Sequence, residues 1–464
     1  MRLSKNAHAK NNYKIIPLIG MFLLCILMTY SLFIGFANED KTWQVYSLNL
    51  FILLIFVVWT MLYSSFSMFF MSSSFWMAVT ILFYFVLKSI EQVNFQGRDD
   101  LLMPLFAVIV FVFFYTIGYF ITPGMRLNKN INVKINWSKM YLYCLISFFV
   151  LKGASFLAFA LLSSGAETAL EVIAETQNMG MAYLFRIFMV SNVAFYILLF
   201  RYYSSGEFKR TVLILTLCMF VDLVLNASRS GIILLFFVHL YFRHKYIKPV
   251  PIGLLFCLFP ILVFVVSFFG YVRDIGIGNL SVYWDAFKMM SDDIDIVFVL
   301  FMARMDVLPL VADAMKLYAK GDIHTLWGGS YIYSFMHFIP RGLWLDKPPL
   351  TAAYVTSIVR PELFADGVNI YPSIILEAFI NFIWIGVGIV GLIVGFFCKK
   401  FDDFFNSGNV LYVVWCMFFF TFPMGLVNEG LHSNYFANMI YLSFIMYLFF
   451  IGAKKVNAIK IIKV

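Results

Sequence analysis

Charged side chains are scarce in this sequence, and their scarcity decides its broad class. Only 13% of the 464 residues are Asp, Glu, Lys or Arg, whereas soluble proteins carry about 25%. Hydrophobic residues make up 62% of the chain and aromatic residues 20%, and the mean hydropathy is +0.88. This composition excludes a soluble globular protein. It also lacks the basic face in polar surroundings that a nucleic-acid partner requires.

Cysteine is also scarce, and its positions exclude a disulfide framework. The six cysteines all fall inside apolar runs, at Cys25, Cys144, Cys218, Cys257, Cys398 and Cys416. No CxxC metal site is present, so we expect these side chains to pack as small hydrophobic groups. The carboxylates of Asp292, Asp293 and Asp295 are typical of a solvated helix start, where acids are favoured. The sequence therefore predicts no metal site and no cofactor.

Long apolar runs are abundant. A transmembrane helix needs about 20 apolar residues, and twelve stretches qualify: 15–36, 44–64, 68–88, 101–121, 139–163, 184–203, 211–227, 229–246, 250–270, 372–398, 410–427 and 433–452. The first run is longer than the apolar core of a signal peptide, so we expect it to stay as an uncleaved helix. The predicted fold class is an all-α polytopic integral membrane protein.

The short loops between these runs alternate in charge. Cations fill one set of loops and the C-terminal tail, and acids such as Glu39, Asp40, Glu91, Asp99 and Glu171 fill the other set. Short basic loops stay in the cytoplasm. We therefore predict that both termini lie in the cytoplasm. The net charge of +9 would face the anionic inner leaflet.

One long segment interrupts the apolar pattern, from Tyr271 to Tyr371. It holds eight cations and eleven anions, and long loops of mixed charge can be exported. The chain then divides into residues 1–270 with nine predicted spans, 271–371 as a large external loop, and 372–464 with three spans and the tail. Within the loop we predict a helix that starts near Ser291, is kinked at Pro309, ends near Gly321 and lies along the membrane interface.

Three arginines at predicted outer helix ends are candidates for binding a phosphorylated ligand. The guanidinium groups of Arg229, Arg273 and Arg341 present planar forks that match phosphate oxygens, and Lys347 follows in the same loop. Each arginine has an alternative: it can reach the interface with its long side chain or pair with a neighbouring acid, as Arg273 can with Asp274.

Two residues are candidates for a general base. Glu377 lies about one turn inside the tenth predicted span, where ionisable groups are costly and usually functional. Its alternative is a structural partner for an arginine. His337 is the rival base, with a plain surface histidine as its alternative.

Aromatic and glycine patterns are less specific. Trp327, Tyr331, Tyr333 and Trp344 fit sugar stacking and an interfacial aromatic belt equally well. The segment 386–391 fits GxGxxG, but no strand precedes it, so a dinucleotide site fails its context. Together with Gly395 it favours close helix packing instead.

Three segments resemble a known family. They are SRSG at 228–231, IPRGLW at 339–344 followed by DKP at 346–348, and EAFINF at 377–382 followed by Gly386. With the late external loop, they resemble the bacterial O-antigen and capsule repeat-unit polymerases, called Wzy, which are similar to metal-independent GT-C glycosyltransferases.

This resemblance implies a substrate, a reaction and partners. A growing glycan moves from undecaprenyl diphosphate onto an incoming lipid-linked repeat unit at the outer face of the bacterial cytoplasmic (inner) membrane, in lipopolysaccharide or other polysaccharide biosynthesis. A chain-length regulator is a candidate partner. Arg229, Arg273, Arg341 and Lys347 would bind the diphosphate, and Glu377 or His337 would act as base. Losing one of these arginines is expected to cost about 10²–10³-fold in turnover.

Two other functions stay open. An O-antigen ligase would use the same donor chemistry with a different acceptor. A flippase or transporter of the lipid-linked oligosaccharide would concentrate charge within its spans, whereas here charges well inside the spans are few, namely Lys152, Asp222 and Glu377.

Overall fold

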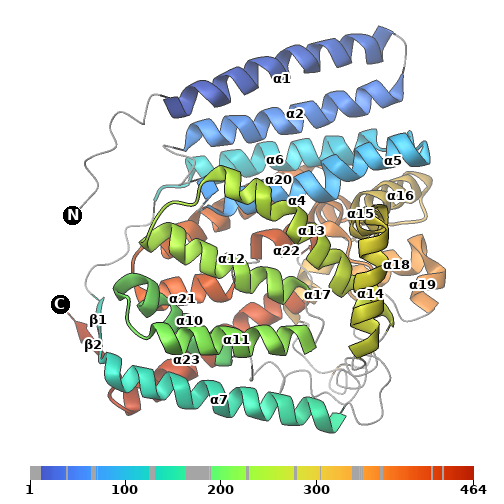
Figure 1. Cartoon of the computed structure of the whole chain (residues 1–464). Coiled ribbons are helices and arrows are strands. Elements are labelled where there is room, and N and C mark those ends of the chain that lie inside the picture. Colours follow the sequence, from blue (N-terminus) through green and yellow to red (C-terminus); the bar gives the residue numbers. More distant parts are fainter. Residues whose placement is uncertain are drawn as a thin grey trace. The chain divides into compact units, whose positions relative to one another are not determined.

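Helices form nearly all of the regular structure (Figure 1), as the composition predicts. The computed structural model describes residues 12–37, 40–63, 69–70, 72–124, 131–162, 188, 190–225, 229–275, 280–303, 305–336, 344, 346, 348–365, 369–419, 422–430 and 433–463. All six cysteines are free thiols. The chain groups into two compact units, each built from separate stretches of sequence.

The first unit combines residues 1–125, 305–403 and 421–438. Its helices are α1 (Asn12–Ala37), α2 (Lys41–Leu62), α4 (Ser73–Ile81), α5 (Lys88–Gln96), α6 (Leu102–Ile121), α16 (Val307–Lys320), α17 (Gly329–Phe335), α18 (Thr351–Val359), α19 (Pro361–Ala365), most of α20 (Ser373–Asn406) and α22 (Phe422–Glu429). A π-helical turn, η2 (Leu82–Leu87), joins α4 to α5. Helices α1 and α2 pack side by side along their length (Figure 1).

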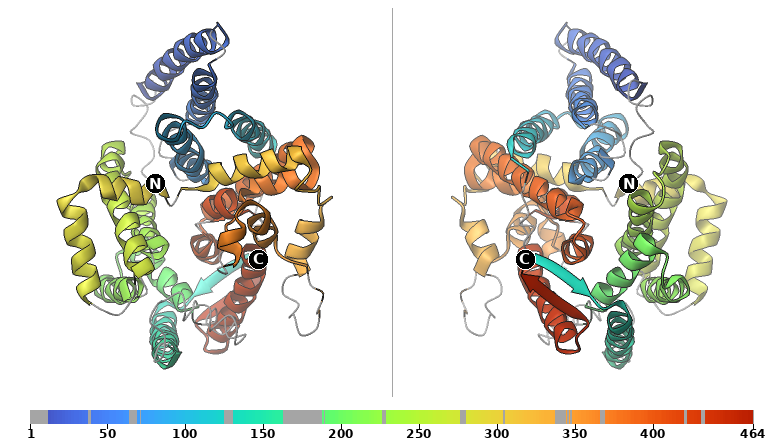
Figure 2. Two further views of the ribbon diagram at one scale, coloured as in Figure 1. Left: turned by 90° about the vertical axis from the view of Figure 1, so that its right-hand side faces the viewer. Right: turned by 90° about the vertical axis from the view of Figure 1, so that its left-hand side faces the viewer.

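The second unit combines residues 126–304, 404–420 and 439–464. Its helices are α7 (Trp137–Leu162), α10 (Val190–Ser205), α11 (Lys209–Leu225), α12 (Arg229–Tyr246), α13 (Ile252–Ile275), α14 (Leu280–Asp292), α15 (Ile294–Ala303), α21 (Val410–Phe418) and most of α23 (Ser433–Lys455). Two strands, β1 (Ile131–Ile135) and β2 (Ile459–Lys463), pair antiparallel with Lys134 opposite Lys460, as the two arrows in Figure 2 show. The purely helical prediction did not include this ribbon.

Five of the described helices are long and apolar enough to cross a membrane: Lys41–Leu62, Ser73–Gln96, Leu102–Ile121, Trp137–Leu157 and Ser373–Asn406. Shorter apolar segments occupy Leu23–Gly35 and Cys257–Val272. These helices fit a multi-pass membrane protein. Twelve crossings, the external position of residues 271–371 and the three-part division remain predictions. The eleventh predicted span, 410–427, is divided between α21 and α22.

Helices α6 and α20 approach each other at backbone contact distance. A Cβ added to Gly391 would lie 2.6 Å from the Phe111 carbonyl oxygen, and one added to Gly395 would lie 2.2 Å from that of Tyr115. On the α6 side, a Cβ at Gly118 would lie 2.1 Å from the Leu392 carbonyl oxygen. The predicted glycine-mediated helix packing is therefore confirmed for Gly391 and Gly395, because only glycine permits this approach.

The segment between α13 and α17 folds differently from its prediction. Instead of one helix from Ser291, it contains α15 and α16 as separate helices. Pro309 lies in the first turn of α16, where a missing N–H costs nothing, so it does not mark a kink. The predicted end is confirmed, since Gly321 caps α16 in the left-handed conformation. The start is displaced: Ser291 and Asp292 end α14, and α15 begins at Ile294, where the Asp293 carboxylate accepts a hydrogen bond from the Asp295 backbone N–H at 2.9 Å.

Candidate functional site

Glu377 is the buried acid at the start of α20. The helix begins at Ser373, so Glu377 lies one turn inside it, as predicted. Its side chain is almost completely buried, with 1% exposure. The other two charges predicted inside the membrane neutralise each other, since Lys152 Nζ lies 2.6 Å from Asp222 Oδ2 in the second unit. Glu377 takes no part in this ion pair.

Hydroxyl groups from two other helices bind the Glu377 carboxylate. Ser330, on α17, donates to Oε1 at 3.2 Å, and Thr351, the first residue of α18, donates to the same oxygen at 3.2 Å. Hydrogen bonds of this kind favour the charged form of a buried carboxylate. Ser330 directly precedes Tyr331, one of the aromatic residues singled out in the sequence, so the structure brings this segment against the sequence-predicted base Glu377.

Asn381 fixes the geometry of this contact. Its Nδ2 donates to Ser330 Oγ at 2.6 Å and to the Glu377 backbone carbonyl at 2.7 Å. Its Oδ1 accepts from the Gly328 backbone N–H at 3.0 Å. Each polar atom of the amide therefore positions α17 against α20. Asn381 lies in the EAFINF segment, but no sequence pattern identifies Ser330 as its partner.

The helix α20 breaks directly after Asn381. Phe382 and Ile383 have non-helical backbone angles, and Ile383 has φ 54° and ψ −140°. A positive φ at a β-branched residue is a true outlier, and such strain clusters at functional sites. Gly386 belongs to this break: a Cβ there would lie 2.3 Å from the Ala378 carbonyl oxygen of the same helix. Its role is therefore to permit the break, which corrects the prediction that it packs against a neighbouring helix.

The end of α22 closes the other side of Glu377. Gly430 has φ 79°, and a Cβ added there would lie 2.7 Å from Glu377 Oε2, so a larger residue would collide with the carboxylate. The preceding residue, Glu429, borders the same narrow space as Glu377, together with Thr351 and Pro372. Burial raises the pKa of Glu429 above its ordinary value. Two carboxyl groups thus face one enclosed space.

Tyr331 adds a buried hydroxyl to this region. Its side-chain oxygen is inaccessible to solvent and has no hydrogen-bond partner among the described residues. Burial raises the pKa of Tyr331 well above its ordinary value, and the Glu377 charge adds to the shift. A buried hydroxyl without a partner marks a place where a further polar group can bind.

The site offers acid–base and hydrogen-bonding chemistry. Within the described ranges, no three His, Cys, Asp or Glu side chains gather in a way that could hold a metal ion. The space that Glu377 and Glu429 border is too narrow for a sugar ring in this conformation. A substrate would need its walls to separate.

The predicted phosphate-binding residues are placed only in part. Arg229 begins α12, and Arg273 lies near the end of α13. Ile232 packs with Phe269 and Val272 in one cluster, so the backbones of Arg229 and Arg273 lie at the same end of this helix pair. The side chains of both arginines, and Arg341, Lys347 and His337 altogether, lie outside the described residues. The convergence of the three arginines remains a prediction.

The four aromatic residues singled out between positions 327 and 344 divide into two groups. Trp327 is 76% exposed, and the ring centroids of Tyr333 and Trp344 lie 6.5 Å apart in an edge-on arrangement. Tyr331, in contrast, belongs to the buried cluster. Three of the four aromatics are therefore available to a ligand or a membrane surface.

A charged network that the sequence did not predict lies elsewhere in the first unit. Lys88, only 3% exposed, lies 3.0 Å from Glu91 and 3.3 Å from Asp306. Nearby, Arg98 contacts Asp100 at 2.7 Å and Asp313 at 2.6 Å, and holds the pKa of Asp100 below its usual range.

Arg360 completes this network by pairing with Asp313. These cations are engaged by acids, so Arg98 and Arg360 are poor candidates for a diphosphate. Arg98 and Asp313 are 215 residues apart in sequence, and no local pattern identifies such partners.

Comparisons with protein-family models, curated proteins and solved structures find no match to this chain.

Proposed function

We propose that this protein is a membrane-embedded glycan polymerase of the O-antigen type, which transfers a growing glycan from undecaprenyl diphosphate onto an incoming lipid-linked repeat unit. The three family-like segments, the long mixed-charge segment and the multi-pass helical character support this proposal. The observation that carries it is the Glu377 cluster. Its buried carboxylate accepts hydrogen bonds from two hydroxyl groups, and the nearby Tyr331 hydroxyl has no hydrogen-bond partner in the described part of the chain. Such a carboxylate is suited to accept a proton from a sugar hydroxyl.

The reaction needs one base and a site for negative charge. The acceptor hydroxyl oxygen forms a bond to the anomeric carbon, the bond from that carbon to the diphosphate oxygen breaks, and the hydroxyl proton passes to the Glu377 carboxylate. Undecaprenyl diphosphate leaves with its bonding electron pair. Arg229, Arg273 and Arg341, with Lys347, would stabilise that charge as it develops, which lowers the barrier.

Access to Glu377 requires a local opening. Thr351 donates to the carboxylate from the first residue of α18, so displacement of this helix start would free Oε1 for a sugar hydroxyl. Hydrogen bonds of catalytic groups often form fully only when substrate is bound. The incoming hydroxyl would replace Thr351 as the donor.

The test is glycan extension by the purified full-length protein in liposomes containing undecaprenyl-diphosphate-linked repeat units. Glu377→Gln keeps the size of the side chain but removes the base, and turnover should fall about 10²–10⁴-fold. Glu362→Gln, at an exposed position of α19, is the matched control and should extend glycan at the wild-type rate. Wild-type protein that makes no longer product, or Glu377→Gln that keeps full turnover, would contradict the proposal.

A deletion strain distinguishes polymerase from ligase. Loss of a polymerase leaves lipopolysaccharide capped with a single repeat, whereas loss of a ligase leaves no O-antigen. Resupply of the wild-type gene must restore the ladder of chain lengths.

One observation favours a second candidate, a transporter of lipid-linked oligosaccharide. Transporters often bind their substrates at discontinuous membrane helices, and α20 is interrupted at Phe382–Ile383 beside the buried Glu377. A transporter would move labelled lipid-linked repeat units across the liposome membrane without lengthening them. The same liposomes therefore separate the two functions.

A further inference from the structure

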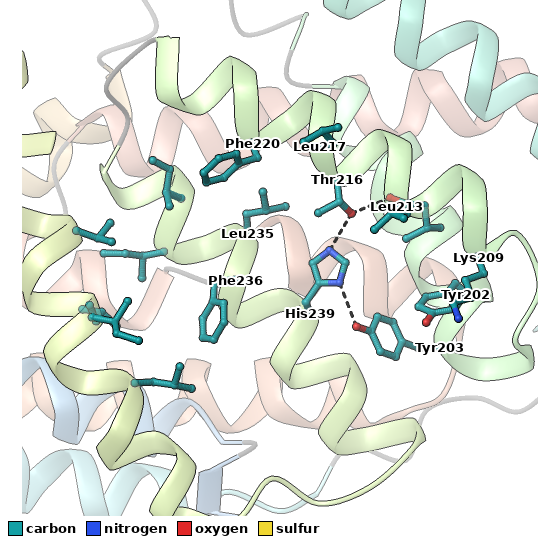
Figure 3. A pocket seen from close by; sticks show the side chains of 17 residues that line it. Tyr202, Tyr203, Lys209, Leu213, Thr216, Leu217, Phe220, Leu235, Phe236 and His239 are labelled. Carbon is teal, nitrogen blue, oxygen red and sulfur yellow. Dashed lines mark hydrogen bonds between the residues drawn. The ribbon is translucent and has the colours of Figure 1, made fainter. Parts of the chain in front are cut away.

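A second site lies in the second unit, among α10, α11, α12 and α13. These helices enclose a cavity of about 630 Å³ (Figure 3), within the range of small-molecule sites in proteins. It is separate from the Glu377 cluster, which belongs to the first unit. A ligand in this cavity would not depend on the proposed transferase activity.

The lining of the cavity changes from apolar to polar along its length. Most of its wall is hydrocarbon, including Leu217, Phe220, Leu235 and Phe236. Tyr202, Tyr203 and Lys209 gather at one end, as Figure 3 shows. Such a gradient fits a ligand with a long apolar chain and a charged or polar head.

His239, in the middle, does not require a polar ligand. Its Nδ1 lies 3.1 Å from the Tyr203 hydroxyl and its Nε2 lies 3.0 Å from the Thr216 hydroxyl. In a neutral imidazole one nitrogen donates and the other accepts, so both are satisfied by these partners. The middle of the cavity therefore suits hydrocarbon.

The cavity opens toward the outer surface of its helices. Leu213 and Leu217 on α11 and Ile261 on α13 all line it, yet they are 70%, 62% and 59% exposed. The sequence predicts that α11, α12 and α13 cross the membrane. A lipid chain can then enter sideways without passing through water.

Cations surround the polar end. Lys209 lines the cavity and is exposed, and the Arg243 charge acts on the Tyr203 hydroxyl. Neither cation pairs with a carboxylate among the described residues. The acid at this end, Glu207, is already engaged by Arg201. The local charge complements an anionic head group.

We propose that this cavity binds an anionic glycerophospholipid, with one acyl chain along the apolar wall and the phosphate beside Lys209. A zwitterionic lipid would gain less from the excess of cations, and a free phosphate would leave the apolar wall unused. The lipid fills a gap between helices that would otherwise lack packing contacts.

The test is native mass spectrometry of the full-length protein, delipidated in detergent and titrated with phosphatidylglycerol or phosphatidylcholine. Wild type should bind phosphatidylglycerol more tightly. Leu217→Trp places a bulky ring in the cavity and should weaken binding about tenfold, the loss expected when two methylenes are excluded. Ile214→Trp is the matched control, on the same helix and 56% exposed but outside the lining.

The head-group contact has its own pair of variants. Lys209→Gln should weaken phosphatidylglycerol binding about fivefold and leave phosphatidylcholine unchanged, and Arg210→Gln, the next residue, is the control. If Leu217→Trp lowers the melting temperature of the protein, Phe236→Trp is the second variant that fills the cavity. Equal binding of the two lipids, equal effects of the Leu217 and Ile214 variants, or complete displacement by undecaprenyl phosphate at equal concentration would overturn the proposal.

Discussion

Asp402 offers the sharpest test of the packing in the first unit. Its side chain is buried, with 5% exposure, near the end of α20. Its carboxylate accepts the Ser73 backbone N–H at 2.9 Å and the Tyr119 hydroxyl at 2.6 Å. It thereby caps the start of α4 from a position 329 residues away in sequence. We predict that Asp402→Ala strongly destabilises the protein.

The size of the loss in unfolding free energy follows from the hydrogen-bond donors that would lose Asp402 as their acceptor. The Ser73 N–H and the Tyr119 hydroxyl would both be buried without an acceptor, at about 1–3 kcal/mol each. The Ser73 hydroxyl already has a second acceptor, the Cys398 carbonyl oxygen at 3.2 Å, and adds little. The free energy of unfolding should therefore fall by about 2–6 kcal/mol. Asp402→Asn keeps one acceptor oxygen, so its loss should be intermediate.

The assay is equilibrium unfolding in mixed detergent micelles, followed by circular dichroism and tryptophan fluorescence. Asp403→Ala is the neighbouring control. Asp403 is partly buried and pairs with Lys399 one turn earlier in the same helix, and such helical pairs contribute about 0.2–0.5 kcal/mol. If Asp402→Ala and Asp403→Ala lose the same stability, the capping role of Asp402 is wrong.

Two further predictions concern packing and pH. Gly395→Ala should destabilise the protein, because the added methyl group would force α6 away from α20. Gly153→Ala, where an added Cβ meets nothing within 4 Å, should stabilise the protein by about 0.5–1 kcal/mol. Equal effects of the two substitutions on the melting temperature would contradict the close approach of α6 and α20. Burial raises the pKa of Glu429 in the folded state. Its contribution to the stability of the folded protein is therefore complete below the pKa of the unfolded state, about 4.3, and is lost as pH rises through the folded-state pKa. Glu429→Gln should therefore gain melting temperature over wild type at pH 8 but not at pH 4, and a difference independent of pH would refute this assignment.

Local features of the sequence predicted the positions of most helices. Apolar runs of sufficient length can satisfy their backbone hydrogen bonds in a membrane only as helices or closed barrels, and ten of the twelve runs overlap one continuous helical stretch each. The run 372–398 coincides with the broken helix α20, and the run 410–427 is divided between α21 and α22. Gly321 as a helix end and Gly391 with Gly395 as a packing pair were also predictable. In both cases the chemistry of glycine acts within one or two turns.

The partners of these helices were not predictable in the same way. Helices such as α2 and α7 are apolar on every side, so their sequences do not indicate which face packs against which neighbour. The pairing of Asp402 with Ser73 and of Arg98 with Asp313 depends on residues hundreds of positions apart. The β1–β2 ribbon joins two short segments, INVKI and IKIIK, whose β-branched residues are typical of strands. Nothing in either segment indicates that they pair with each other, because they lie far apart in the sequence.

The candidate site shows the same division. The sequence alone identified Glu377 as unusual, because a carboxyl group one turn inside an apolar helix is costly to bury. Tertiary structure decided what surrounds it, since Ser330, Thr351 and Gly430 reach it from three other segments. The composition of a chain determines which groups are expensive to bury, and only the packing of distant segments determines which groups compensate them.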